Sequence, residues 1–243
     1  MPRDRRFGPR GSFCMVCLIN PPLVMAHAFF LGVDLEDDDG SVEAALSVFE
    51  KEDQGEAPSR FRLDHARRRP VESPDALADR LQSFVAERPY TGRTNIVVNR
   101  SVESGAALID ALKDRGLDPV AVTFTGRDGG GDADEAGVSL GGADAVQILA
   151  ELYRDGRLVV ESHTTEAASQ LARGLQRAAE VLDAADGDQD TPEAAGSTLD
   201  ALDDGNAQVV SAALAAWCGT ERSFDPSQHL KADPHTRRPD EGR

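Results

Sequence analysis

The sequence predicts an α/β domain: a mixed five-stranded sheet, three antiparallel strands and then alternating helices and strands, with helices on both faces. Two observations support this prediction. Residues 28–64 hold three segments of strand character, and a tight turn joins the first two. Helical and strand periodicities then alternate, which is typical of parallel strands linked by helical crossovers. The apolar runs at 96–98 and 120–122 are continuous, as expected for strands buried on both faces.

The antiparallel part begins at the apolar segment Ala28–Leu35. A short acidic turn leads from it into Ser41–Glu50, so the two segments are expected to pair as a hairpin. The alternating residues Arg60–Asp64 predict a half-exposed third strand. Pro70 and Pro74 are expected to end this meander, because proline interrupts the ladder of a sheet.

Helical spacing of apolar residues predicts five helices in the rest of the chain. The first follows Ser73-Pro74, a typical start signal, and ends before Pro89. Strands are expected at 95–99, 120–124 and 157–160. The apolar positions that mark the helices are 77, 81, 84 and 85; 108, 109 and 112; 146, 149 and 153; 171, 175, 178 and 182; and 209, 210, 213, 214 and 217.

The expected domain spans residues 28–218, with flexible loops at 126–140 and 183–198. Residues 1–27 form a basic leader whose composition differs from that of the acidic body. We expect a disordered extension there, which need not include the natural start, while a secretion signal is the alternative. The polar, proline-containing residues 219–243 are expected to form a disordered tail.

The chain is strongly acidic, because 43 Asp and Glu residues outnumber 26 Lys and Arg residues and give a formal net charge of −17. Nearly all basic residues are Arg. This balance is typical of halophilic proteins, whose self-repulsion is screened in molar salt by a Debye length of about 3 Å; an ordinary acidic protein is the alternative. Such a surface repels phosphates, so general nucleic-acid binding is disfavoured, although the cluster Arg67–Arg69 could line a local groove.

Cysteine and glycine usage exclude several classes of site. Three cysteines, at positions 14, 17 and 218, provide neither a disulfide framework nor four zinc ligands, which fits a reduced cytoplasmic setting. No segment approaches the roughly 20 unbroken apolar residues of a membrane span, so no membrane association is expected. The run Gly129–Gly131 lacks the Lys of a phosphate-binding loop, so no ATP binding is expected.

Several stretches, in this order and at this spacing, resemble one branch of the ribonuclease H-like superfamily, the nuclease domain of viral large terminase subunits. The resemblance implies a ribonuclease H-like sheet and a viral or provirus-related role. It implies a stand-alone domain, because no residues remain for the ATPase motor of a terminase. The stretches are 31–34 with its hairpin, 95–99 with 105–112, 116–126, and 149–160 with 209–217.

The resemblance also implies a site that cuts DNA with two divalent metals, Mg²⁺ or Mn²⁺, held by several carboxylates. The first expected acid matches Asp34. The second and third positions fall at Asn99 and Gln208, whose amides are neutral. Two metal ions held by one carboxylate would repel each other, so we expect a degenerate site that holds no cofactor.

Two functions stay open for such a chain. It could be a catalytically degenerate protein with a binding or structural role, whose partner is DNA or a DNA-processing protein. Alternatively, it could be an active metal-dependent endonuclease in which Asp34 and Asp204 are catalytic and Glu103 is a further metal ligand. Acids near helix starts also interact favourably with the helix dipole, which is a structural explanation for Glu103 and Asp204. An actin-like ATPase is disfavoured, because the acids at 36–39 would repel phosphate.

Overall fold

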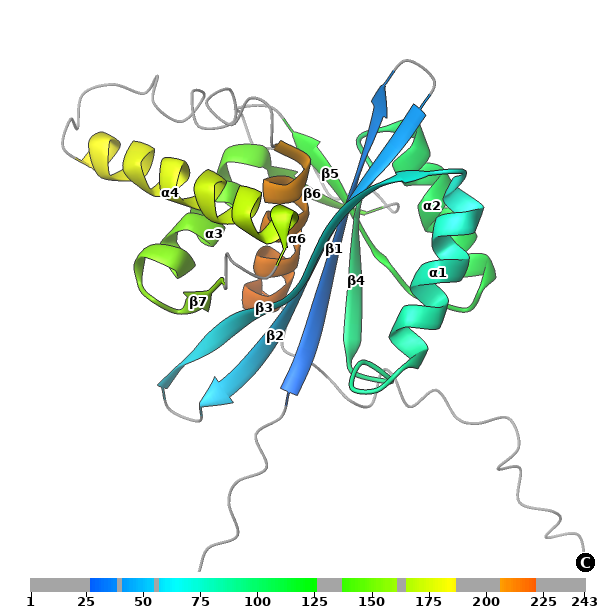
Figure 1. The fold of residues 1–243 in the computed structure, drawn as a ribbon, viewed down its shortest axis with the longest axis horizontal. Coiled ribbons are helices and arrows are strands. Elements are labelled where there is room, and N and C mark those ends of the chain that lie inside the picture. The colour runs from blue at the N-terminus through cyan, green and yellow to red at the C-terminus, as the bar shows by residue number, and fades with distance from the viewer. Residues whose placement is uncertain are drawn as a thin grey trace, which may run out of the picture.

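The computed structural model describes residues 27–38, 41–54, 57–125, 137–160, 165–186 and 206–221. These residues form an α/β domain whose mixed sheet has helices on both faces, as predicted (Figure 1). The predicted number of five strands is wrong, since the sheet has seven. Almost all of the predicted N-terminal extension and C-terminal tail, and most of the two predicted loops, lie outside the described residues.

The sheet combines an antiparallel meander with parallel strands. β1 (His27–Asp38), β2 (Ser41–Gln54) and β3 (Ala57–Val71) form the meander. β4 (Thr94–Asn99) and β5 (Val120–Thr125) extend it in parallel beside β1. Within the described sheet, β2 is antiparallel to both neighbours and the other neighbouring pairs are parallel, as expected for strands joined by crossovers.

Two short strands form the edges of the described sheet. β6 (Val138–Gly141) pairs with β5 and lies at the end of the segment predicted as a loop over 126–140. β7 (Leu158–Val159), predicted as a strand over 157–160, pairs with β3. The order across the sheet is β6-β5-β4-β1-β2-β3-β7. A strand as short as β6 carries too little periodicity to be told from a loop.

β3 is longer than predicted. The alternating pattern indicates a strand over Arg60–Asp64, whereas β3 pairs with β2 as far as Val71. Pro70 lies within the strand rather than ending it. A proline is tolerated there because this part of β3 lies at the edge of the described sheet, where one side of the backbone has no ladder to complete.

In the described part of the chain, five helices cover the sheet, each near its predicted position. α1 and α2 lie on one face, while α6 lies directly on the other, with α3 and α4 packed against it (Figure 1). α4 continues to Asp186, so the first residues of the loop predicted over 183–198 are helical. The bounds are α1 (Pro74–Ala86), α2 (Glu103–Asp114), α3 (Gly142–Arg154), α4 (Glu166–Asp186) and α6 (Asn206–Glu221).

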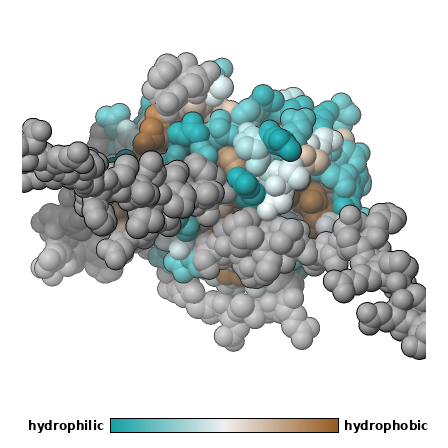
Figure 2. Space-filling view, turned by 90° about the horizontal axis from the view of Figure 1, so that it is seen from below, coloured by the Kyte–Doolittle hydropathy of each residue, from teal (hydrophilic) through white to brown (hydrophobic). Residues whose placement is uncertain are grey.

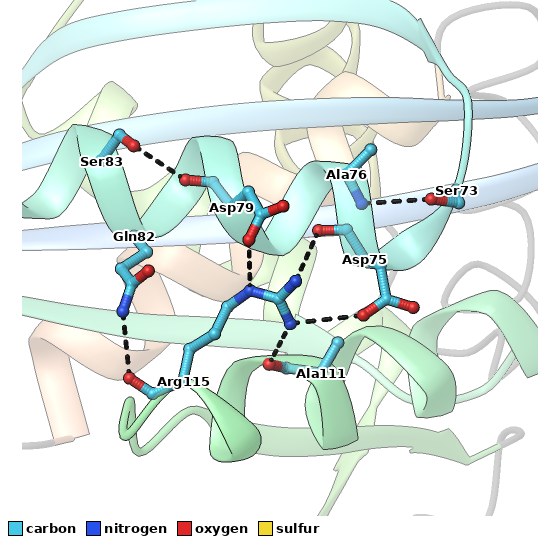
Figure 3. Close-up of polar contacts among 8 residues, drawn as sticks. All are labelled: Ser73, Asp75, Ala76, Asp79, Gln82, Ser83, Ala111 and Arg115. Atoms are coloured by element: carbon cyan, nitrogen blue, oxygen red, sulfur yellow. Dashed lines mark hydrogen bonds and ion pairs between the residues drawn. The ribbon is translucent and has the colours of Figure 1, made fainter.

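Arg115, at the end of α2, joins α2 to α1 (Figure 3). Its Nε donates to Asp79 Oδ1 (2.7 Å), and its Nη1 donates to Asp75 Oδ1 (3.3 Å) and to Ala111 O (2.8 Å). Gln82 Nε2 donates back to Arg115 O (3.1 Å). The hydrogen bond from Arg115 lowers the pKa of Asp79. One guanidinium therefore links two helices that are adjacent on the sheet.

α6 is the central helix of the core. Nearly all of its side chains from Ala207 to Cys218 are buried, because the sheet covers one side of the helix and α3 and α4 cover the other. Trp217 is buried at its C-terminal end, as predicted. Gly32 of β1 permits the close approach of α6, because a Cβ atom at this position would overlap with the backbone oxygen of Ser211.

The described surface is mostly hydrophilic on the face shown in Figure 2, with small separate hydrophobic areas. Among the described residues, Val159 is the one large apolar side chain that is strongly exposed, at 47%. No helix in the described part of the chain is both long and apolar enough to cross a membrane.

Candidate functional site

A pocket of about 430 Å³ opens at the carboxyl ends of β1, β4 and β5. Ligand sites of open α/β sheets form at this edge, where loops and helix starts surround the strand ends. We call it the Asp34 pocket. Its polar wall comes from the end of β1 and from β4, and its apolar wall comes from α3, α6 and the segments that follow β4 and β5. The residues that line it are Asp34, Leu35, Glu36, Asp37, Asn99, Val102, Phe124, Gly142, Ala145, Val146, Val210 and Ala213.

Asp34 is the buried acid of this pocket. Alternation along β1 places it on the same face as Gly32, toward α6, where it is 5% exposed. Burial raises the pKa of Asp34 to about 7, because the charged carboxylate is desolvated. The hydrogen bond from Asn99 acts in the opposite direction, and the negative charge of Glu36 adds to the increase. Asp34 is therefore an acid that exchanges its proton near neutral pH.

Asn99, at the end of β4, presents a hydrogen-bond donor to Asp34. Its Nδ2 lies 2.7 Å from Asp34 Oδ1, and its Oδ1 accepts from the backbone N–H of Ser101 (2.9 Å). A backbone N–H can only donate, so the amide oxygen must face Ser101 and the amide nitrogen must face Asp34. Asn99 therefore directs N–H groups toward the carboxylate, and its oxygen is already used.

The described residues do not fit a two-metal site. Mg²⁺ binds through oxygen ligands, and Asn99 offers Asp34 a nitrogen donor instead. No group of three or more His, Cys, Asp or Glu residues that could hold a metal is present in the described ranges. Glu36, the nearest further acid along β1, accepts a hydrogen bond from Arg68 (2.8 Å), which also binds Glu43 (2.7 Å).

Glu103 and Asp204 were the other predicted ligands. Glu103 begins α2, is exposed, and does not line the Asp34 pocket. Its position in the first helical turn fits the structural explanation, since an acid there interacts favourably with the helix dipole. Asp204 lies outside the described residues. Of the predicted acids, the structure therefore places Asp34 at the pocket and Glu103 away from it.

Gln208, at the third position that the resemblance implies, points away from the pocket toward β2. Its side chain is fully buried, and its Nε2 donates to Leu46 O (3.0 Å) and to Ser47 Oγ (2.7 Å). Ser47 Oγ of β2 in turn lies 2.8 Å from the Oγ of Ser211, which is on α6 like Gln208. The side chain therefore attaches the first turn of α6 to the sheet, which is a structural role.

The apolar wall of the pocket was not predicted from the sequence. Val146, Val210 and Ala213 have helical spacing, and this pattern is the same for residues that face a core and residues that face a pocket. Asp37 was likewise interpreted as part of an acidic turn. The only available signal was that several segments of the chain all end at the same edge of a sheet.

The arrangement favours a ligand or partner group that is largely apolar. The volume of the Asp34 pocket lies within the roughly 300–1,000 Å³ typical of small-molecule sites, and most of the residues that line it are aliphatic or aromatic. One buried carboxyl and one amide at the base provide polar anchors. Glu36 and Asp37 at the same wall disfavour a phosphate group by charge repulsion.

Comparisons with known proteins identify no relative of the chain: no family model matches it, and no curated protein or solved structure is significantly similar to it. The geometry of the Asp34 pocket is therefore the basis for its functional interpretation.

Proposed function

We propose that this chain is a ribonuclease H-like protein, similar to the nuclease domain of viral large terminase subunits, that has lost two-metal catalysis and serves to bind a partner. The strand order β3-β2-β1-β4-β5 in the centre of the sheet, with β2 antiparallel to its neighbours, supports the fold assignment. Asp34 on β1 and Asn99 at the end of β4 stand where the resemblance implies two carboxylates.

The observation that carries the loss of catalysis is the hydrogen bond from Asn99 to Asp34. Two divalent ions about 3.5–4 Å apart need several anionic oxygens to offset their mutual repulsion. Here an amide donor occupies the place of the second acid and stabilises Asp34 without a cation. The carboxylate of Asp34 is thus a buried group that a hydrogen bond satisfies.

A protein is favoured over DNA as the partner. The formal charge of −17 repels a phosphate backbone, and the acids Glu36 and Asp37 line the pocket that would receive the scissile phosphate. The apolar wall, by contrast, suits an apolar side chain of another protein. A DNA-processing protein is the partner class that agrees with the resemblance.

Plasmid cleavage tests this proposal. The full chain and Asp34→Ala are incubated in molar KCl with supercoiled plasmid and Mg²⁺ or Mn²⁺. Neither protein is expected to nick the plasmid more than buffer does. Metal-dependent nicking by the natural chain that is lost in Asp34→Ala would contradict the proposal and support the endonuclease alternative. Asp204→Ala then shows whether this acid takes part.

A binding measurement gives a positive result to accompany the cleavage assay. Val146→Trp fills the apolar wall of the Asp34 pocket, while Val159→Trp places the same side chain on an exposed strand far from it in the sheet order. The partner for this measurement is a DNA-processing protein that the natural chain binds. If a group of this partner enters the pocket, Val146→Trp should lose the binding and Val159→Trp should keep it. Equal binding by both variants would exclude the pocket as the contact.

A further inference from the structure

The second half of β3 has an unpaired edge among the described residues. On one side, β3 pairs with β2 along its length. On the other side, β7 pairs with it only at Phe61 and Arg62, and no described strand continues this ladder from Leu63 to Val71. In Figure 1 this part of β3 crosses in front of β1 on its way to α1. Such an edge presents a row of backbone N–H and C=O groups to a further strand.

A second pocket, of about 160 Å³, lies beside this edge between the sheet and α1. We call it the arginine pocket. It is too small for a drug-sized ligand, which needs roughly 300 Å³ or more, but it suits a single apolar side chain. Its apolar lining comes from β1, β2 and one face of α1, and β3 contributes its basic residues. The residues that line it are Leu31, Leu46, Val48, His65, Arg67, Arg69, Leu77, Arg80, Leu81 and Phe84.

The three arginines make this pocket locally positive in a strongly acidic chain. Because side chains alternate along β3, Arg67 and Arg69 face α1, whereas Arg68 faces the opposite side and binds Glu36. Arg80 makes one long ion pair, 3.7 Å to the exposed Glu72. Neither Arg67 nor Arg69 forms an ion pair with any described residue. Their charges are available to an anionic partner.

We propose that the unpaired edge of β3 binds an extended acidic peptide of a partner protein, which adds a strand to the sheet and inserts one apolar side chain into the arginine pocket. In an added strand, side chains two residues apart lie on the same face. An Asp or Glu two residues from the apolar anchor would therefore meet Arg67 or Arg69. The expected motif is an apolar residue with acids at both i−2 and i+2, so that one of the two acids lies opposite an arginine whichever way the added strand runs.

Peptide binding explains the combination of features better than two alternatives do. Charged side chains on an edge strand also hinder aggregation, which accounts for the arginines but not for an apolar pocket between them. Single-stranded nucleic acid would use the arginines, but its backbone cannot continue a β-ladder, and its many phosphates are repelled by the net charge of −17. A short peptide with two acids experiences much less of that repulsion.

The inference is independent of the proposed function. Arg67 and Arg69 lie on the face of the sheet that carries α1, and Asp34 lies on the face that carries α6. Failure of one site therefore leaves the other unaffected.

The test uses an immobilised library of peptides of about ten residues, a length that matches one strand. Each peptide has a central Leu, Ile, Met or Phe, with Asp or Glu at i−2 and i+2 and varied residues elsewhere. Matched libraries carry Lys or Arg, or Ser, at the two flanking positions. The full chain is expected to bind members of the acidic library at least about tenfold more tightly than their basic or neutral counterparts.

Three variants locate the binding site. Arg67→Glu/Arg69→Glu is expected to weaken binding at least about tenfold. Arg60→Glu/Arg93→Glu, which changes the net charge equally at exposed positions outside the pocket, is expected to bind like the natural chain. Leu46→Trp fills the pocket without changing charge and is expected to abolish binding. Thermal unfolding confirms that each variant is folded before its affinity is compared.

Backbone methylation distinguishes an added strand from other modes of binding. N-methylation of alternate residues removes the N–H groups along one edge of an extended peptide, and one of the two alternating sets is expected to abolish binding while the other preserves it. The proposal is overturned if no acidic peptide binds, if the two arginine double variants lose binding equally, or if both methylated sets still bind. Tighter binding of single-stranded DNA at the same arginines would overturn it as well.

Discussion

The amide nitrogen of Asn99 lies 2.7 Å from a carboxylate oxygen of Asp34, with the amide oxygen held by the backbone of Ser101. Just beyond the last pair of the β1–β4 ladder, β1 thus carries an acid and β4 carries a hydrogen-bond donor. A pair of acids at these positions would require a shared proton or a metal to offset their charge. The observed pair requires neither, which makes the Asp34 pocket stable without a cation.

Asn99→Asp is expected to create a dependence on divalent metal. In EDTA at pH 8 the variant should be less stable than the natural chain by about 1–3 kcal/mol, because two carboxylates then meet in a buried site and the donor is lost. Addition of Mn²⁺ should raise the melting temperature of the variant more than that of the natural chain. Calorimetry at several metal concentrations measures both effects. In the swapped variant Asp34→Asn/Asn99→Asp, which restores one acid and one amide, the metal effect should disappear.

Asp34 is expected to make stability depend on pH. Its pKa is about 7 in the folded protein, against an ordinary value of 3.8, so the folded chain binds the proton more tightly. The stabilisation of the folded chain by this proton is fully present below pH 4 and is lost as the pH rises through 7. When the pH is lowered from 8 to 5, the free energy of unfolding of the natural chain should rise by about 2–3 kcal/mol relative to that of Asp34→Asn, in which this position does not titrate. Urea unfolding of both proteins across this range gives the difference, and parallel pH profiles would contradict the buried, protonatable carboxyl.

Gly32→Ala is expected to destabilise the fold by about 3 kcal/mol or more, since the new methyl group would overlap with the backbone of α6 at Ser211. Gly92 provides the control. Its φ is +66° and no atom lies within 4 Å of an added Cβ, so Gly92→Ala should cost only the roughly 1–2 kcal/mol of a left-handed backbone. Chemical denaturation measures both variants. Similar losses at the two glycines would contradict the close contact between β1 and α6.

Gln208→Leu is expected to destabilise the chain by about 1–3 kcal/mol, because Leu46 O and Ser47 Oγ lose a buried donor. Ser47→Ala removes one of these acceptors. If Gln208 acts through this hydrogen bond, the double variant should lose less stability than the sum of the two single losses. Additive losses would show that Gln208 and Ser47 do not interact. The same variants should leave the Asp34 pocket unchanged, since Gln208 does not line it.

Local patterns predicted most of the regular elements. α1 begins at Pro74, as expected, and the Oγ of Ser73 accepts a hydrogen bond from Ala76 N (3.1 Å). The helical spacing that ends at Trp217 corresponds to the buried helix α6. These features depend on neighbours within a few residues, so the sequence contains them directly. β3 was predicted too short because Pro70 ends most strands but not an edge strand, and edges are a property of the assembled sheet.

The candidate site was predicted only in part. Asp34 was identified because a lone acid at the end of an apolar strand stands out in the sequence. Its partner Asn99 was identified as a neutral residue where the resemblance implies an acid, but the direction of its amide depends on the N–H of Ser101 and on a strand 65 positions away in the chain. Gln208 was expected at the same site and instead binds β2.

The α/β order of elements, the acidic character of the chain and the acid within the first apolar segment follow from local sequence patterns. The tertiary structure decided which groups meet: it places a donor against Asp34, turns Gln208 away from it, and separates Arg68 from Arg67 and Arg69 on opposite faces of the sheet. The physical reason is that periodicity sets the face on which a side chain lies, whereas hydrogen-bond partners and sheet edges arise from pairing between distant segments.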